Sequence, residues 1–405
     1  MSPCRSPTRS ASESMTASEA GALDGVSVLD LSSVGPAARA TRLLADYGAD
    51  VVKVGPVPRR AGVATVPPAY AYSGHRGMKR ALLDLKSDGG RGAFLDLARR
   101  ADVVVESFRP GVVDRLGIGY ESVRAVSEGI VYCSTSGYGQ TGPRHHWAGH
   151  DLNYLAVSGY LHCSGRDRDG APALPGATVA DIAAGGMHAA LAIMAALLRR
   201  ERTGTGEHLD VSVADGALGM MALYADEHLA TGVEPGPGHY ILTGRYACYG
   251  VYACADGEYL SVAAIEPAFW ANLCRALGLD RYVDAQTDDE LQDEIRAALA
   301  ARFATADRDE WVRRLGPADC CVAPVNRVSE AVRDDQYLAR GAVVKAAHPT
   351  DGTVEQVGAV WAGAVAAEPA CRLPDLTETA TAELLAEAGY DDARVAALAS
   401  AGVIA

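Results

Sequence analysis

The sequence predicts an α/β fold, with a Rossmann-like parallel-sheet large domain and a smaller α+β domain. Three observations support this: short apolar segments alternate with helical ones from Gly25 on, the helical segments carry capping residues, and a Gly/Pro-rich stretch precedes a hairpin pattern. The strands expected in the first part are 26–32, 49–54, 102–107 and 130–136, and the helices 36–48, 87–101 and 120–129. This alternation is typical of a parallel sheet that binds ligands at the carboxyl ends of its strands.

Local signals justify the first helices. Pro36 suits the first turn of the helix over 36–48, and Gly48 suits its C′ position. Ser87 is the candidate N-cap of the helix over 87–101. The capping residues therefore favour helices between the apolar strands.

The second half of the chain begins with a polar loop after Gly159. A long apolar helix is expected from Asp181 to Arg202, followed by a strand within 203–213, a helix over 214–232, a hairpin over 246–265 and helices over 267–278 and 288–304. The hairpin consists of two alternating runs joined at "ADGE". The predicted limits are a disordered leader at 1–21, the first part of the large domain at 22–232, the small domain at 235–335 and a segment at 340–405 that returns to the large domain.

Composition excludes several classes of protein. A net charge of −14 argues against nucleic-acid binding, which needs a basic face. Nine scattered cysteines without a C-x-x-C pair indicate reduced thiols and a cytoplasmic location. The Ser-rich first twenty residues do not resemble a secretory signal. The apolar run 183–198 is shorter than the roughly 20 residues of a membrane span, so a buried core helix is expected.

The segment "GYGQTG" at 137–142 formally matches a dinucleotide-binding motif. Such a motif needs a helix that opens at its third glycine, but Gly142 is followed by Pro143. A flexible turn is the favoured interpretation. Gly137, Tyr138 and Gly139 would then let the backbone approach a ligand.

Three histidines lie within the segment "HHWAGH". The segment lacks the H-E-x-x-H register, and no partner cluster is evident, so we expect no metal site and place His145 and His146 on an exposed loop. His150 and Asp151 directly precede a helical run. They are equally consistent with an oxyanion-stabilising helix start and with an ordinary N-cap beside an incidental histidine.

Two further carboxylates stand at expected helix starts. Asp181 opens the long apolar helix, where desolvation would raise its pKa towards that of a general base, although an N-cap role explains it equally. Glu266 lies between an apolar strand and Pro267 and can be a simple helix-start acid.

Basic residues gather in the first half of an acidic chain, and several follow strands, where phosphates would bind. For most of them an ordinary surface charge is an equally good explanation. They are Lys53, Arg59, Arg60, Arg76, Lys79, Arg80 and Arg109.

Taken together, these segments resemble the family III coenzyme A transferases, and within them the α-methylacyl-CoA racemases. The resemblance runs from about Gly25 to the end of the chain. Its most specific pieces are "LLADYGADVVKV", "ADVVVESFRPGVVDRLGIGYE", "SGYGQTGP", "AGHDLNY", "VADIAAGGMHAALAIMAAL" and "RTGTGEHLDVSVADG".

The resemblance assigns roles to the candidate residues. Asp181 matches the helix-start aspartate that forms acyl-enzyme intermediates in the transferases and acts as an acid/base in the racemases. His150 matches a histidine that the racemases have and the transferases usually lack. Glu266 matches the glutamate that supports this histidine. The family further implies an interlocked homodimer and a coenzyme A site in the large domain, for which the candidates are Arg59, Lys79, Arg109, Gly137, Tyr138 and Gly139.

The chain also departs from the family pattern. Gly55-Pro56 stands where a Glu-Arg pair usually helps to hold coenzyme A, which leaves Arg59 or Arg60 as the replacement. Ser134 and Thr135 stand in a strand that is often Met-containing in racemases. These substitutions indicate a more polar acyl pocket.

The resemblance implies a racemase or epimerase that inverts the α-carbon of a 2-substituted, for example 2-methyl, acyl-CoA through an enolate, with His150 and Asp181 as the acid/base pair. Backbone N–H groups near Asp151 would hold the enolate oxygen. The alternative is a transferase that moves coenzyme A between carboxylic acids through an acyl-Asp181 intermediate, and a third reading is a binding protein without catalysis. Coenzyme A enters as part of the substrate; no other cofactor, no metal, no nucleic acid and no membrane is expected.

Overall fold

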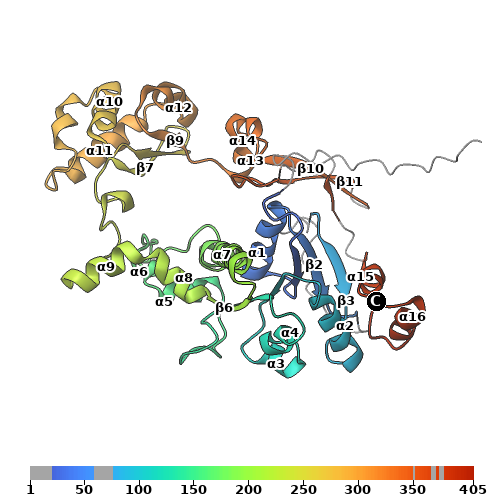
Figure 1. The fold of residues 1–405 in the computed structure, drawn as a ribbon. Helices are drawn as coiled ribbons and strands as arrows, with labels where there is room; N and C mark the ends of the chain where they lie inside the picture. The colour runs from blue at the N-terminus through green and yellow to red at the C-terminus, as the bar shows by residue number, and fades with distance from the viewer. Residues whose placement is uncertain (1–20, 59–75, 350–351, 366–370, 374–377) are drawn as a thin grey trace, which may run out of the picture. The chain divides into compact units, whose positions relative to one another are not determined.

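The computed structural model describes residues 21–58, 76–349, 352–365, 371–373 and 378–405. The chain divides into two compact units (Figure 1). Unit 1 comprises Met1–Asp151, Thr178–Gly216 and Ala339–Ala405, and unit 2 comprises Leu152–Ala177 and Ala217–Leu338. This division differs from the predicted limits in giving 152–177 and 217–232 to the second unit.

Unit 1 is built on a six-stranded sheet with the order β3-β2-β1-β4-β5-β6, in which all neighbours are parallel. Its strands are β1 (Ser27–Asp30), β2 (Asp50–Gly55), β3 (Lys79–Leu82), β4 (Val103–Glu106), β5 (Val131–Ser136) and β6 (Glu207–Ser212). The strand order reverses at β1 and β4, and ligands of such sheets bind at the carboxyl ends beside this switch point. The predicted Rossmann-like sheet is confirmed.

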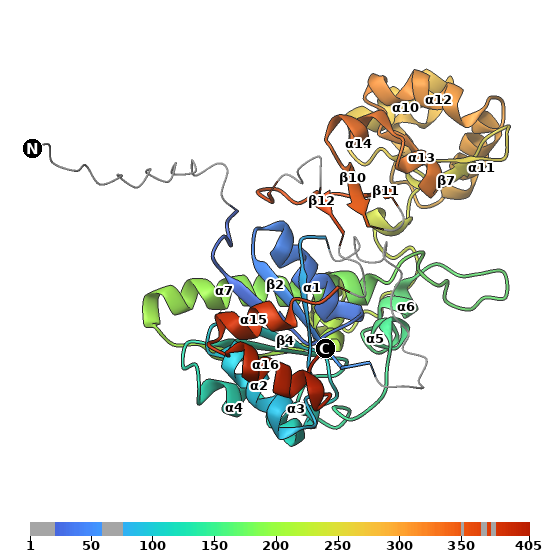
Figure 2. The same cartoon turned by 90° about the vertical axis from the view of Figure 1, so that its right-hand side faces the viewer.

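Helices cover both faces of this sheet (Figures 1 and 2). Val28 of β1 points to the face that packs against α1 and α7, and its neighbour Leu29 to the face that packs against α2. These helices and the others of unit 1 are α1 (Gly35–Asp46), α2 (Asp88–Ala98), α3 (Val112–Leu116), α4 (Tyr120–Arg124), α7 (His188–Thr203), α15 (Thr381–Glu387) and α16 (Asp392–Ser400). Because both faces are buried, the central strand β4 is an almost continuous apolar run, whereas the edge strands β3 and β6 carry charged residues.

The capping predictions are confirmed. Ser87 is the N-cap of α2, and its hydroxyl accepts a hydrogen bond from the Gly90 N–H at 3.0 Å. Pro36 lies in the first turn of α1. Gly48 follows this helix with a φ of 101°, a backbone conformation that favours glycine.

The long apolar helix starts as a π-helix, η2 (Ala180–Met187), and continues as α7. The sequence predicts one helix from Asp181 to Arg202, and its π-helical first turns were not expected. A Cβ atom on Gly185 would lie 2.6 Å from Cβ of Pro36, and one on Gly186 would lie 2.9 Å from Cβ of Arg39. The two glycines therefore let the wider helix approach the backbone of α1.

The combined helix Ala180–Thr203 is long and apolar enough to cross a membrane by length and composition alone, with a mean hydropathy of 1.6. Its buried positions Ala189, Ile193 and Leu197 pack in the core beside α1 and the sheet. This packing is that of a core helix in unit 1.

The remaining elements of unit 1 lie near its edges. Helix α8 (Val213–Met220) follows β6 and crosses into unit 2, and β10 (Val343–His348), β11 (Gly352–Val357) and β12 (Cys371–Arg372) form a separate sheet. The antiparallel pair β10–β11 forms a second hairpin. Strand β3 was not predicted, because it has only four residues and two of them, Lys79 and Arg80, are charged.

Unit 2 contains the predicted hairpin, β7 (Tyr249–Ala253) and β8 (Tyr259–Ala263), joined by β9 (Val322–Pro324) into an antiparallel sheet. Trp270, Phe303 and Trp311 are fully buried in its core. The predicted helix over 214–232 is broken at Met221 into α8 and α9. The helical elements of unit 2 are α5 (Asp151–Val157), α6 (Tyr160–Cys163), α9 (Ala222–Thr231), η3 (Ile241–Thr243), α10 (Pro267–Leu277), η4 (Asp280–Ala285), α11 (Gln292–Phe303), α12 (Arg308–Leu315), η5 (Gly316–Ala318), α13 (Val328–Ala331) and α14 (Asp335–Ala339).

The packing against the π-helix yields a stability prediction. A Cβ atom on Gly216 would lie 2.2 Å from the carbonyl oxygen of Ala184, whereas one on Gly219, in the same helix α8, would meet nothing within 4 Å. We expect Gly216→Ala to destabilise the protein by about 1–3 kcal/mol, as overpacking does. Gly219→Ala should be neutral or stabilising, since alanine favours helices. Urea unfolding of both variants checks this, and equal stabilities would contradict the packing.

Candidate active site

A buried ion pair fixes the carboxyl ends of β1 and β2. Lys53 Nζ lies 2.6 Å from Asp30 Oδ2, and the Asp30 side chain is fully buried. The other oxygen, Oδ1, accepts hydrogen bonds from the N–H and hydroxyl of Ser32, and the Thr41 hydroxyl of α1 donates to Oδ2. Lys53 therefore helps to hold the loop after β1 and the start of α1 through Asp30. Its ammonium group is not available to bind a phosphate.

Asp181 lies in the first turn of the π-helix. The segment before it is tied to α1, because Arg39 Nη2 donates to the Thr178 hydroxyl at 2.9 Å. Val179, not Asp181, is the N-cap residue, so an N-cap role for Asp181 is excluded. Its half-buried carboxyl group is left for another function.

Asp151 connects the two helix starts. Its Oδ1 accepts a hydrogen bond from the backbone N–H of Asp181 at 2.9 Å. Helix α5 begins at Asp151, and the exposed His150 directly precedes it. Three of the predicted catalytic residues, His150, Asp151 and Asp181, thus come together in unit 1.

The surroundings of Asp181 raise the pKa of its carboxyl group. Burial is the largest cause, and the neighbouring charge of Asp151 adds to it. Arg39 and His150 act in the opposite direction. A carboxyl whose pKa is shifted towards neutrality suits proton transfer near pH 7.

The three histidines of the opening segment separate. His145 Nδ1 lies 2.6 Å from the Gly142 carbonyl oxygen, and the rings of His145 and His146 lie 3.7 Å apart. Both line a polar cavity rather than accompany His150. The prediction that they are simple loop residues therefore missed the cavity.

Glu266 lies in unit 2, where it is the exposed N-cap residue of α10 and Pro267 opens the helix. The thiol of Cys321 is close enough for the Glu266 charge to raise its pKa, after the larger effect of burial. Support of His150 by Glu266 stays a prediction.

The predicted coenzyme A contacts fall into different environments. Arg59 lies outside the described residues. Lys79 Nζ lies 3.2 Å from Glu383 Oε1, both partly exposed. Arg109 follows β4 at the switch point, is exposed, and has no carboxylate partner in the described part of the chain. Arg109 is therefore the best-placed of the three for a phosphate.

The Gly-rich turn after β5 is held by a carboxylate. Asp210 accepts from the Gln140 N–H at 3.0 and 3.1 Å, and Gly139 has a φ of 82°. No helix opens at Gly142, since helix α5 begins only at Asp151. As the sequence indicated, the turn is not a dinucleotide-binding helix start. Its hydrogen bonds to Asp210 fix it, however, whereas a flexible turn was expected.

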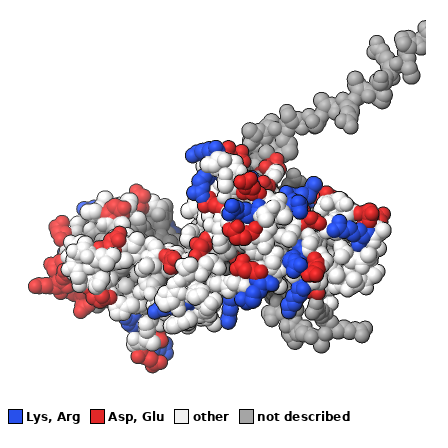
Figure 3. All heavy atoms as spheres, turned by 60° about the horizontal axis from the view of Figure 1, so that its bottom comes forward, with Lys and Arg blue, Asp and Glu red and all other residues white. Residues whose placement is uncertain are grey.

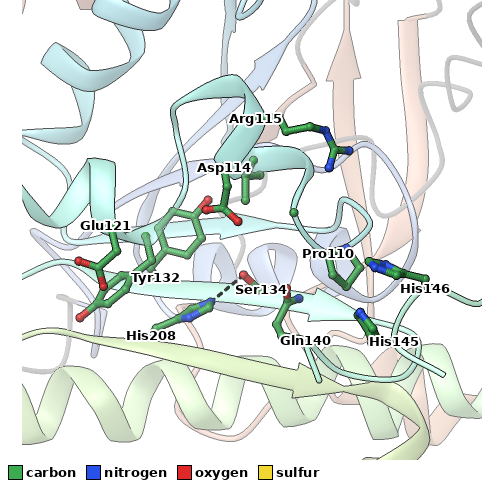
Figure 4. Close-up of a pocket in the computed structure, with 13 residues that line it drawn as sticks. Pro110, Asp114, Arg115, Glu121, Tyr132, Ser134, Gln140, His145, His146 and His208 are labelled. Carbon is green, nitrogen blue, oxygen red and sulfur yellow. Dashed lines mark hydrogen bonds between the residues drawn. The ribbon is translucent and has the colours of Figure 1, made fainter. Parts of the chain in front are cut away.

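A cavity of about 480 Å³ was missed by the sequence analysis (Figure 4). It is lined by polar side chains of α3, α4, β5, β6 and the adjoining loops, among them Asp114, Arg115, Ser134 and His208. Glu106, the last residue of β4, is the register partner of the lining residue Ser134 and is 2% exposed. An acidic residue at the end of the apolar run "DVVVE" was the available signal.

On the face drawn in Figure 3, acidic and basic side chains are interspersed and do not form a continuous basic surface. No group of three His, Cys, Asp or Glu side chains suited to a metal ion occurs among the residues that the structure describes.

The sheet order, the helix-start carboxylates and the exposed arginine at the switch point give an α/β protein with a candidate site at the carboxyl edge of its large sheet. Comparison with known proteins gives the family. The chain belongs to CoA-transferase family III, whose model matches residues 23–377. It is therefore an enzyme that acts on acyl-CoA.

Named relatives include both racemases and transferases. The chain is 35% identical to the human α-methylacyl-CoA racemase over 326 residues, which is 80% of this chain and 82% of the relative. It is 32% identical to the mouse succinyl-CoA:glutarate CoA-transferase, over 94% of this chain and 90% of the relative. The crystal structure of a CAIB/BAIF family protein from Brucella suis superposes with a TM-score of 0.76 at 28% identity, covering 91% of this chain and 100% of that one.

The contact between Asp151 and Asp181 yields a prediction on pH dependence. Asp151→Asn removes a negative charge that raises the pKa of Asp181, so this pKa should fall. Because Asp181 must be ionised to act as a base, the acid limb of the kcat/KM profile should move to lower pH. Turnover measured from pH 4.5 to 8 checks this, with the exposed Asp215→Asn as control. An unmoved or raised acid limb would contradict the assignment.

Proposed function

We propose that this protein is an acyl-CoA racemase that inverts C2 of a 2-substituted acyl-CoA by 1,1-proton transfer. The observation that carries the proposal is the arrangement of Asp181 with His150: a carboxyl with a raised pKa, held through Asp151, lies within electrostatic reach of an imidazole. A proton-transfer pair needs two such groups and no cofactor beyond the substrate's own coenzyme A.

The chemistry follows from these groups. The thioester carbonyl acidifies the hydrogen on C2, and one group, carboxylate or neutral imidazole, removes this proton from one face. The electron pair moves onto the carbonyl oxygen as an enolate. The other group, as carboxylic acid or imidazolium, returns a proton to the opposite face, and the reverse assignment serves the other enantiomer.

Backbone N–H groups at the start of α5 are suited to the enolate oxygen, because the first N–H groups of a helix have no partner within the helix. The N–H of Asp181 does not serve this purpose, since Asp151 already accepts from it. The candidates for the oxyanion site are therefore the backbone N–H groups near Asp151.

A transferase is the second candidate. Its nucleophile would be Asp181, and the relative with transferase activity named above aligns with more of this chain than the racemase does. A transferase would attach the acyl group to Asp181 and would not need His150. The two candidates therefore differ in what the histidine does.

Deuterium exchange tests the racemase proposal. Each enantiomer of a 2-methylacyl-CoA, incubated in D₂O, should gain deuterium at C2 and lose optical purity. His150→Ala and Asp181→Asn should each lower the rate by about 10²–10⁴, as loss of an acid/base group does. His162→Ala replaces an exposed histidine of unit 2 and should leave the rate unchanged. Absence of exchange with the wild-type protein and both enantiomers would refute the proposal.

We further propose a homodimer. Helix α7 exposes Leu191 and Leu198, two turns apart, at 65% and 58%, and α9 exposes Leu223 and Leu229. Exposed leucines on one helix suit a partner interface, and the family resemblance points to a second copy of the chain. Light scattering should give twice the chain mass at micromolar concentration, and Leu191→Glu should shift it towards the monomer. A monomeric wild-type protein would contradict this.

A further inference from the structure

A line of polar side chains runs across three neighbouring strands. Glu106 ends β4, Ser134 is its register partner on β5, and His208 lies on β6. Ser134 Oγ lies 2.9 Å from His208 Nε2, and the Ser134 hydroxyl is also a hydrogen-bond partner of the Glu106 carboxyl group. We call these three residues the relay. Figure 4 shows its Ser134–His208 contact on the floor of the polar cavity.

The relay is held rigidly. Glu106 and Ser134 are each 2% exposed. The His208 ring stacks on Tyr120 at 5.2 Å and meets the edge of Tyr132 at 5.6 Å. Because Glu106 and Ser134 are buried, a hydrogen bond lost at either side chain is costly, whereas His208 is exposed and reaches solvent.

The single proton of the Ser134 hydroxyl couples the two ends of the relay. When Glu106 is ionised, Ser134 donates to its carboxylate and accepts from His208 Nε2–H. When Glu106 carries a proton, it donates to Ser134, and Ser134 donates to the unprotonated Nε2. The charge of Glu106 and the proton on His208 Nε2 are therefore linked, and the cavity gives the histidine access to solvent protons.

Glu106 changes charge near neutral pH. Burial raises the pKa of Glu106 to about 7, and the negative charge of Asp114 on α3 adds to this rise. The hydrogen bonds from Ser134 and from the Phe108 N–H act in the opposite direction and lower the pKa. Burial lowers the pKa of His208, whereas the negative charges of Asp210, Asp114 and Glu121 raise it to a smaller extent. Tyr132 and Cys133 of β5, the other titratable groups that feel the charge of Glu106, have raised pKa values and stay neutral.

The loop that follows Glu106 is where this charge acts. Glu106 Oε2 accepts from the Phe108 N–H at 2.7 Å, and a hydrogen bond to an ionised acceptor is about twice as strong as a neutral one. Phe108 precedes Arg109, the exposed arginine at the switch point. Ionised Glu106 thus holds the loop 107–111 more tightly than protonated Glu106.

We propose that Glu106, Ser134 and His208 are positioning residues, which hold the Arg109 loop in the shape that binds the coenzyme A part of the substrate and release it when Glu106 takes up a proton through Ser134 and His208. This inference rests on the proposed acyl-CoA chemistry only in requiring that coenzyme A binds at the switch point. It does not require racemisation.

Calorimetric titration with free coenzyme A at pH 6 and pH 8 tests the relay. With a pKa of about 7, the ionised fraction of Glu106 rises from about 10% to about 90%, so wild-type affinity should rise several-fold. Ser134→Ala removes a hydrogen bond that favours the carboxylate, so affinity at pH 8 should fall towards that at pH 6. Ser134→Thr keeps the hydroxyl and should restore the pH response.

Ser136→Ala is the matched control, since the Ser136 hydroxyl is buried on the same strand and has no hydrogen-bond partner in the described part of the chain. It should keep the wild-type response. An equal pH response in Ser134→Ala and the wild type would overturn the relay, whereas no coenzyme A binding at either pH would overturn the proposed function as well.

A second measurement is independent of ligand. An acid whose pKa is raised on folding costs stability as pH rises from its unfolded value to its folded one, here from about 4.5 to about 7. Glu106→Gln removes this cost. The urea midpoint of the variant minus that of the wild type should therefore be larger at pH 8 than at pH 4.5. An unchanged difference would show that Glu106 does not titrate there and would overturn the proposal.

Discussion

The close approach of helix α1 to the π-helix η2 is the constraint on which the candidate site depends. Gly185 and Gly186 leave no room for a side chain against Pro36 and Arg39. Helix α1 is itself fixed to the sheet by Thr41, which donates to the buried Asp30. Through these contacts the position of Asp181 is set by the central strands and not by a surface loop.

The carboxyl edge of the sheet supplies the rest of the site. Neighbouring strands end in buried polar groups, and each group orders the loop that follows it: Asp30 orders Ser32 after β1, and Glu106 orders Phe108 after β4. Buried carboxylates are stable only where hydrogen bonds or ion pairs satisfy them. The polar contacts that a buried carboxylate requires are thus the contacts that shape the ligand loops.

Sequence patterns predicted the sheet and its helices because continuous apolar runs and capping residues are local signals. His150, Asp151 and Asp181 could also be found locally, since each stands at a helix start. The π-helix could not be predicted, because isolated glycines such as Gly185 also occur within ordinary helices and their close packing against α1 is visible only in the fold. The relay could not either, because Glu106, Ser134 and His208 meet only when strands far apart in sequence pair in register.

The central claim is that Asp181 exchanges protons and is not a nucleophile. In the transferase reaction, a carboxylate acceptor labelled with ¹⁸O attacks the enzyme-bound thioester at Asp181, and one labelled oxygen stays on the aspartate when coenzyme A takes the acyl group. Mass spectrometry of the Asp181 peptide, after turnover of a 2-methylacyl-CoA with the labelled acid, detects this oxygen directly. The racemase account predicts an unchanged peptide mass while C2 gains solvent deuterium. A peptide heavier by one ¹⁸O atom would contradict it.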